Sequence, residues 1–161
     1  MTSPDDSDMR MTWTLDGHGW VDCTVEDRRA KADLTASYIT SAPEDLLTAV
    51  SRLVAGESET RAQFEAEPTA YRWIFYRQDD EVWIRILELE DGSDHDNKGT
   101  EIWTSQLHVD AVARAVIRCF EEVARTYGES GYRGKWGEHY PRTELEALRR
   151  LGAAHQRGDD A

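Results

Sequence analysis

Apolar and polar residues alternate along the first part of the chain, the pattern of strands with one buried face. Apolar side chains at every second position predict strands over 11–15, 20–25 and 32–38. Tyr38 keeps the period of the apolar positions and is expected to end the third strand. Turn residues follow the first strand and polar residues follow the second, which favours two successive hairpins.

Helical spacing replaces this alternation after residue 40. Ser41 and Glu44 have the spacing of a capping box, and Pro43 suits the first turn of a helix. Apolar residues then recur three and four positions apart as far as Gly56, which is a common residue at helix ends. The sequence therefore predicts a helix between Ser41 and Gly56. The following stretch, 57–68, is polar, with Phe64 as its only anchor.

The second half has the same order of strands followed by a helix. Aromatic and β-branched residues predict strands over 71–77 and 81–90, joined by a tight hairpin, and a further strand over 100–105. A long amphipathic helix is predicted from Val109 to Tyr127, with Gly128 at its end.

The segment 131–141 is rich in glycine and aromatic residues and is expected to be an irregular loop. Tyr132 and Trp136 supply apolar mass that covers one end of the core. Thr143 and Glu146 then form a second capping-box pattern, which predicts a short last helix.

Runs of strands closed by a helix favour the α+β class. We expect two layers, with a mainly antiparallel sheet of about six strands (βββα-βββα-α order) and helices on one face. Residues 11–154 form the expected single domain, 1–10 a disordered tail and 155–161 a frayed tail.

Charge limits the choice of partner. The 161 residues include 32 acids and 19 bases, a net charge of -13, and the folded part is still acidic without the five aspartates of the tails. This sign disfavours nucleic acid and anionic membranes, and it favours a basic partner protein. Acids concentrate around Glu65 and Glu67 and at Asp79, Asp80 and Glu81, which would form one acidic face if they lie on one side. The alternative is a uniformly solvated surface.

No motif for a cofactor, nucleophile or catalytic residue is present, so we expect no cofactor. Cys23 and Cys119 lack metal-ligand spacing, and the N-terminus lacks the features of a signal peptide, which favours a cytoplasmic protein. The loop from Asp91 to Gly99 is dense in oxygen ligands but does not match an EF-hand, and the question of a metal there stays open.

A set of turn glycines and tryptophans carries a resemblance over most of residues 12–152. It comprises Gly19-Trp20, Leu46-Leu47-x-x-Val50 with Leu53 and Gly56, Glu67-Pro68 before Arg72-Trp73, and Gly131-Tyr132 with Trp136 and Pro141. The chain resembles a group of small, functionally uncharacterised acidic proteins of high-GC Gram-positive bacteria, some of which resemble toxin-immunity proteins. The resemblance implies a shared fold and no catalytic residue.

Two functions follow as hypotheses. The first is a non-enzymatic protein-binding domain, in its sharpest form an immunity-type protein that binds a basic partner through the acids named above. The second is a small enzyme or ligand-binding domain with a pocket near 131–141 that uses His139, Tyr140 or Glu138 beside Trp136. A homo-oligomer is a further possibility, because Trp73, Trp83 and Trp103 exceed what a one-sided sheet needs to bury.

Overall fold

The computed structural model describes residues 9–160 of the chain. Its elements, in chain order, are β1 (Arg10–Leu15), β2 (Trp20–Glu26), β3 (Lys31–Ser37), α2 (Ala42–Val54), β4 (Glu59–Glu65), β5 (Ala70–Gln78), β6 (Glu81–Leu89), a short 3-10 helix η1 (Asp96–Lys98), β7 (Thr100–His108), α3 (Val109–Trp136) and α4 (Arg142–Asp160).

The strands form two antiparallel sheets. The first has the order β1-β2-β3 and the second β4-β5-β6-β7. The expected α+β class with antiparallel strands is confirmed, and the structure refines it to seven strands divided into a three-stranded and a four-stranded sheet. Every neighbouring pair within a sheet is consecutive in sequence, so each sheet is a simple meander.

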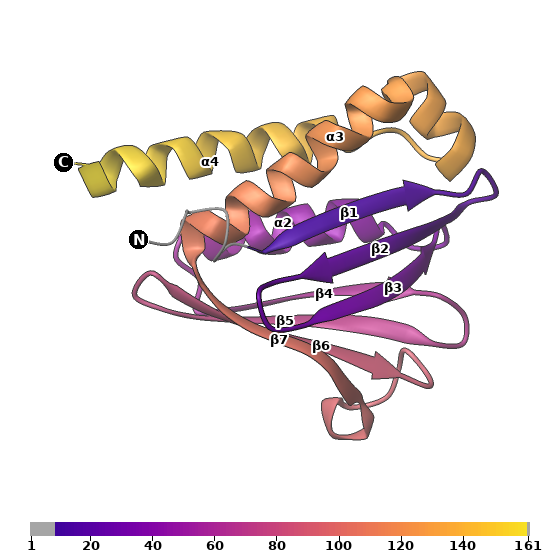
Figure 1. The fold of residues 1–161 in the computed structure, drawn as a ribbon, viewed down its shortest axis with the longest axis horizontal. Helices are drawn as coiled ribbons and strands as arrows, with labels where there is room; N and C mark the ends of the chain where they lie inside the picture. The colour runs from indigo at the N-terminus through magenta and orange to yellow at the C-terminus, as the bar shows by residue number, and fades with distance from the viewer. Residues whose placement is uncertain (1–8, 161) are drawn as a thin grey trace.

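The three helices form a layer against the two sheets (Figure 1). Helices α3 and α4 run side by side, α3 packs on β1, and α2 packs on β4. The sheets meet through β3, which contacts β4, β5 and β7. None of the helices in the described part is both long and apolar enough to cross a membrane.

A chain of aromatic rings joins these layers. The indole of Trp13 in β1 lies 5.6 Å from the ring of Phe64 in β4, 5.3 Å from Phe120 in α3 and 6.0 Å from Trp136 at the end of α3, measured between ring centroids. Phe64 in turn contacts Trp73 of β5. These buried rings make the two sheets and the helices share one hydrophobic core.

One strand was missed by the sequence pattern. The stretch expected to be polar contains β4, whose Thr60, Ala62 and Phe64 are buried while the residues between them face outward. The alternation is present in the sequence, but Thr60 and Ala62 are too small and too weakly apolar to reveal it.

Helix ends differ from the expected ones. Helix α2 begins at Ala42 as predicted, but the Ser41 side chain makes no capping hydrogen bond. Gly128, with φ of 69°, kinks α3 instead of ending it, so 129–136 is helical and the expected loop is shorter. Helix α4 begins at Arg142, which places Thr143 inside it, and continues to Asp160.

The two chain ends also differ in part from the disordered and frayed tails expected from the sequence. Met9 is buried and Arg10 belongs to β1, although both were expected in the disordered tail. The expected frayed tail from residue 155 is helical as far as Asp160. Residues 1–8 and 161, to which the tail predictions also apply, lie outside the described residues.

Replacing Trp136 should destabilise the fold. Its side chain is 1% exposed and contacts Trp13, so Trp136→Ala removes a large buried side chain and leaves a cavity. We expect a loss of about 3–5 kcal/mol in the free energy of unfolding and a fall in Tm of roughly 10 °C. Thermal unfolding followed by circular dichroism measures it, with His139→Ala, at an exposed position, as the unchanged control. A Trp136→Ala protein that melts like the wild type contradicts the packing role.

Candidate functional site

Three large apolar side chains are exposed at one end of the molecule. Trp20 is 38% exposed, Tyr38 52% and Ile39 55%. Trp20 opens β2 and pairs with Ser37 at the end of β3, so it lies next to the β3–α2 connection that carries the other two. We call these three residues the apolar end. Tyr38 and Ile39 are adjacent in the chain, and exposed aromatic and aliphatic groups are typical of protein-binding sites.

The backbone holds Tyr38 in place. Its N–H donates to the Gly19 carbonyl at 2.9 Å, and the Gly19 N–H donates to the Lys135 carbonyl at 3.0 Å. A Cβ added at Gly19 would come within 2.5 Å of Tyr38 Cδ1, and one added at Gly137 within 3.8 Å of Cδ2. The ring therefore packs over two glycines, and this exposed side chain is fixed before any partner binds.

Carboxylates lie beside the apolar end. Glu44 and Asp45 are in the first turn of α2, a few residues after Ile39, and Glu138 and Glu144 approach Glu44 from the α3–α4 connection and from α4. Burial, followed by the charges of Glu144, Asp45 and Glu138, raises the pKa of Glu44. Burial also raises the pKa of Asp45.

These four carboxylates make no ion pair in the described part of the chain, although Asp45 lines a cleft that Arg52, Arg61 and Arg72 also line. Among residues 9–160, no Lys, Arg or His comes within 4.0 Å of their oxygens, and Glu44 Oε1 is buried without a hydrogen-bond partner. The Lys135 side chain lies near Gly17 in the β1–β2 turn and likewise makes no ion pair in this part of the chain. Like charges held together in this way favour the arrival of a cation.

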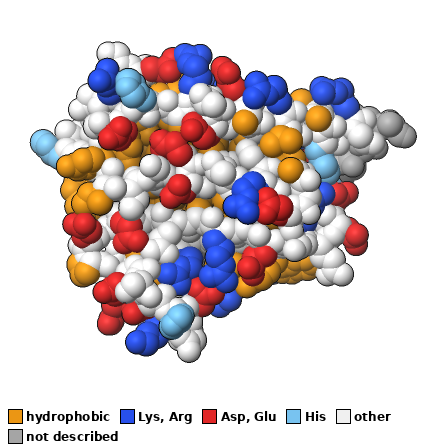
Figure 2. Space-filling model, turned by 180° about the vertical axis from the view of Figure 1, so that it is seen from behind, with side chains coloured by type: hydrophobic (Ala, Val, Ile, Leu, Met, Phe, Trp, Pro, Cys, Tyr) orange, Lys and Arg blue, Asp and Glu red, His pale blue; other side chains and the backbone are white. Residues whose placement is uncertain are grey.

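One of the acids predicted from sequence, Glu67, belongs to the same end. The Glu65 carboxylate does not, because it lies against Gly92 and accepts from Gln63 Nε2 at 2.6 Å. The Ser37 hydroxyl donates to the Glu65 carbonyl at 3.1 Å, which brings the end of β4 next to the end of β3. Glu67 follows in the β4–β5 turn and is exposed. In Figure 2 this end lies at the left, where hydrophobic side chains stand among acidic ones. We call the apolar end together with Glu44, Asp45, Glu67, Glu138 and Glu144 the end surface.

The other three predicted acids lie elsewhere. Asp79, Asp80 and Glu81 form the β5–β6 turn, at the opposite end of β5 and roughly 25 Å from Glu65 by the rise of a strand. Asp80 accepts from Arg77 at 3.1 Å and lies 3.3 Å from His155 Nε2. The predicted acids therefore do not form one face, and Asp80 serves to attach α4.

The segment 131–141 is packed instead of hollow. Tyr132 and Trp136 are buried, while Glu138 and His139 are exposed. Tyr140 is half-buried, and its hydroxyl donates to the Phe120 carbonyl at 2.6 Å. Other segments line the clefts along β7, between α2 and β4, between β1 and α3, and between α3 and α4. The largest, about 820 Å³, runs along β7. The ligand-pocket hypothesis stays a prediction.

Arg72 fills the acidic loop 91–99. Its guanidinium donates to the Asp94 carbonyl at 2.9 Å, to Asp96 Oδ1 at 2.8 Å and to the Gly92 carbonyl at 3.0 Å. These are the kinds of oxygen that a calcium ion would need, and a cationic side chain already binds them. No group of three His, Cys, Asp or Glu side chains in the described part is placed to hold a metal.

The sequence pattern missed most of the end surface. Tyr38 was expected in the third strand, but β3 ends at Ser37, which is buried, and the alternation stops there. The approach of Glu138 to Glu44 spans about ninety positions, and no local pattern encodes it. The signal that the sequence did contain is a pair of adjacent large apolar residues, Tyr38 and Ile39, just before the predicted start of a helix.

The sequence matches no protein-family model and no curated protein. Among solved structures the fold is similar to a chain of the "CdiA-CT/CdiI toxin and immunity complex from Enterobacter cloacae", with 10% sequence identity and a TM-score of 0.44. The match covers 70% of this chain and 97% of that chain. A likeness at this level carries no argument about function.

Removing the charge of Glu44 should stabilise the protein at neutral pH. Because its folded-state pKa is raised, the ionised carboxylate opposes folding above that pKa, and this cost disappears as the pH falls below the ordinary value of 4.5. We expect Glu44→Gln to raise Tm at pH 7 by roughly 1–3 °C, since the group is partly solvated, and to match the wild type near pH 4. Differential scanning calorimetry across this range tests it, with the exposed Glu81→Gln as control. A gain that persists unchanged at acid pH would argue against a charge effect.

Proposed function

We propose that this chain is a non-enzymatic protein-binding domain that binds a basic partner protein through its end surface. The observation that carries the proposal is the exposed, fixed Tyr38 among carboxylates that make no ion pair in the described part of the chain. Tyr and Trp are favoured as interface anchors because they bury a large area at low cost in conformational entropy.

The charges support a basic partner. Arginine or lysine side chains of the partner would relieve the repulsion that raises the pKa of Glu44. The net charge of -13 would speed the encounter with such a protein at low salt. Both effects weaken as salt is added, because the Debye length falls from about 10 Å at 0.1 M to about 3 Å at 1 M.

The sharper form of the proposal is an immunity-type protein that neutralises a basic toxin in the cytoplasm. The acidic composition and the resemblance to the group that includes immunity-like proteins support it. Cys23 and Cys119 support a reducing compartment, since both are buried and unbonded to each other, and burial raises the pKa of each thiol. In this role the chain would act by covering its partner, without catalysis.

The test is affinity capture with the purified chain at low and high salt, identification of retained proteins by mass spectrometry, and titration of the purified partner. Glu138→Lys and Glu81→Lys change the net charge equally, but only the first lies on the end surface. We expect Glu138→Lys and Tyr38→Ala to weaken binding by about tenfold or more, and Glu81→Lys to change it little.

Coexpression distinguishes the immunity-type form from other binding roles. A captured protein that arrests growth alone and not together with this chain supports it, and a harmless partner contradicts it. If no basic protein is retained at either salt concentration, or if Glu81→Lys weakens binding as much as Glu138→Lys, the proposal for the end surface is wrong.

A further inference from the structure

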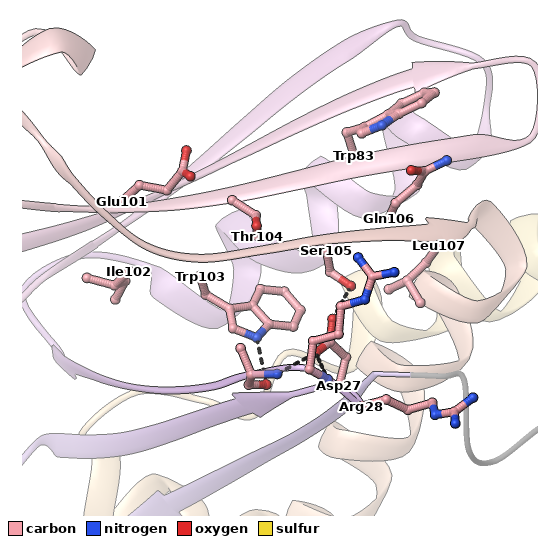
Figure 3. Close-up of a pocket in the computed structure, with 12 residues that line it drawn as sticks. Asp27, Arg28, Trp83, Glu101, Ile102, Trp103, Thr104, Ser105, Gln106 and Leu107 are labelled. Carbon is pink, nitrogen blue, oxygen red and sulfur yellow. Dashed lines mark hydrogen bonds between the residues drawn. The ribbon is translucent and has the colours of Figure 1, made fainter.

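A groove runs along the free edge of β7, the outer strand of the four-stranded sheet. Its volume is about 820 Å³, and its other wall is the tip of the β2–β3 hairpin, residues 27–30. Figure 3 shows β7 passing between Trp83, Thr104 and Gln106 on one side and Trp103, Ser105 and Asp27 on the other. Side chains from both faces of β7 line the groove, so it follows the edge of the strand.

The backbone of β7 offers unused hydrogen-bonding groups to this groove. In an antiparallel sheet, successive residues direct their N–H and C=O groups to opposite sides of the strand. The Val109 N–H donates to the Asp80 carbonyl at 2.8 Å. Residues 103, 105 and 107 therefore also direct their backbone N–H and C=O groups toward β6. Thr104 and Gln106 therefore direct their backbone groups outward. Such an edge is a template for one more strand.

The hairpin wall is fixed to β7. Trp103 Nε1 donates to the Ala30 carbonyl at 3.1 Å, and Ser105 Oγ donates to Asp27 Oδ2 at 2.7 Å. Burial opposes ionisation of Asp27, but the hydrogen bonds from Ser105 and from the backbone N–H groups of Arg29 and Ala30 outweigh it and lower its pKa. The groove is thus preformed, and a strand entering it would not have to order this wall.

The charge of the groove is opposite to that of the whole protein. Arg28 and Arg29 are exposed on the hairpin tip and make no ion pair among the described residues, although Arg29 lies close enough to help lower the pKa of Asp27. Glu101 is neutralised by Arg85 at 2.8 Å. Asp27 contributes one negative charge, so the two arginines leave one net positive charge beside the edge.

This positive charge disfavours a second copy of the chain as the strand that binds in the groove. Antiparallel pairing of β7 with its own counterpart around Thr104 would bring the two hairpin tips together, because Asp27 and Ala30 contact the residues on either side of Thr104. The arginines of both copies would then repel each other. Trp73 and Trp103 are buried within the chain, so of the three tryptophans that suggested self-association only Trp83 is exposed.

We propose that the edge of β7 binds an extended acidic segment of another protein, which adds a fifth strand to the four-stranded sheet. Main-chain hydrogen bonds to Thr104 and Gln106 would hold the segment, and Arg28 and Arg29 would pair with its carboxylates. Trp83, 38% exposed beside Gln106, would pack on its side chains. The inference is independent of the end surface and of the basic partner proposed for it.

The experiment uses a fluorescent synthetic peptide of about ten residues with alternating Thr and Glu, long enough to span β7, and a matched peptide with Lys in place of Glu. Proline is tolerated on an edge strand where its missing N–H would face outward, so Thr104→Pro should fold but lose an outward donor. Thr104→Val keeps the backbone intact. We expect wild type and Thr104→Val to bind the Glu peptide alike, and Thr104→Pro and Arg28→Glu/Arg29→Glu to bind it at least about tenfold more weakly.

Circular dichroism establishes whether each variant is folded. If Thr104→Pro does not fold, the Arg28→Glu/Arg29→Glu variant provides the test. Protection of the Thr104 and Gln106 amides from hydrogen exchange on binding supports strand addition. Equal binding of the Lys peptide overturns the acidic partner, and unchanged binding by a folded Thr104→Pro overturns strand addition. Sedimentation showing a wild-type dimer that Thr104→Pro abolishes would assign the edge to a second copy and overturn the proposal.

Discussion

The packing of Trp13 is the interaction on which the rest of the structure depends. This single indole touches β4 through Phe64, the middle of α3 through Phe120 and the end of α3 through Trp136. The two sheets share no ladder hydrogen bonds, so side-chain packing must set their relative orientation. Aromatic rings suit this task, because each buries a large area and prefers particular edge and tilted geometries.

The same packing assembles the end surface. Gly128 lets α3 bend, and after the bend Trp136 reaches Trp13. The chain that follows places Gly137 under Tyr38 and Glu138 near Glu44. Core packing therefore supplies the energy that holds several carboxylates close together. Neutralising Glu44 is expected to stabilise the protein because a binding site built from like charges costs stability in the free protein.

Local patterns explain how far the sequence could predict this fold. Strands with large apolar residues at alternate positions, such as 20–26 and 81–89, were placed within about two residues of their observed ends, because period-two burial is a local property. β4 was missed because small residues fill two of its buried positions. The division into two sheets and the end surface depend on contacts between distant segments, such as Ser37 with Glu65, that no periodicity records.

Net charge proved a poor guide to the individual surfaces. A value of -13 predicts one kind of partner for the whole molecule. Glu44, Glu138 and Glu144 lie close together at one end, while Arg28 and Arg29 stand beside the free edge of β7. Charges interact with a partner over about one Debye length, roughly 8 Å at physiological ionic strength, which is shorter than a single strand of this sheet. Each surface therefore presents its own local charge. A protein this acidic can attract a basic protein at one end and still accept an acidic strand at the other surface, because distance and salt keep the two fields apart.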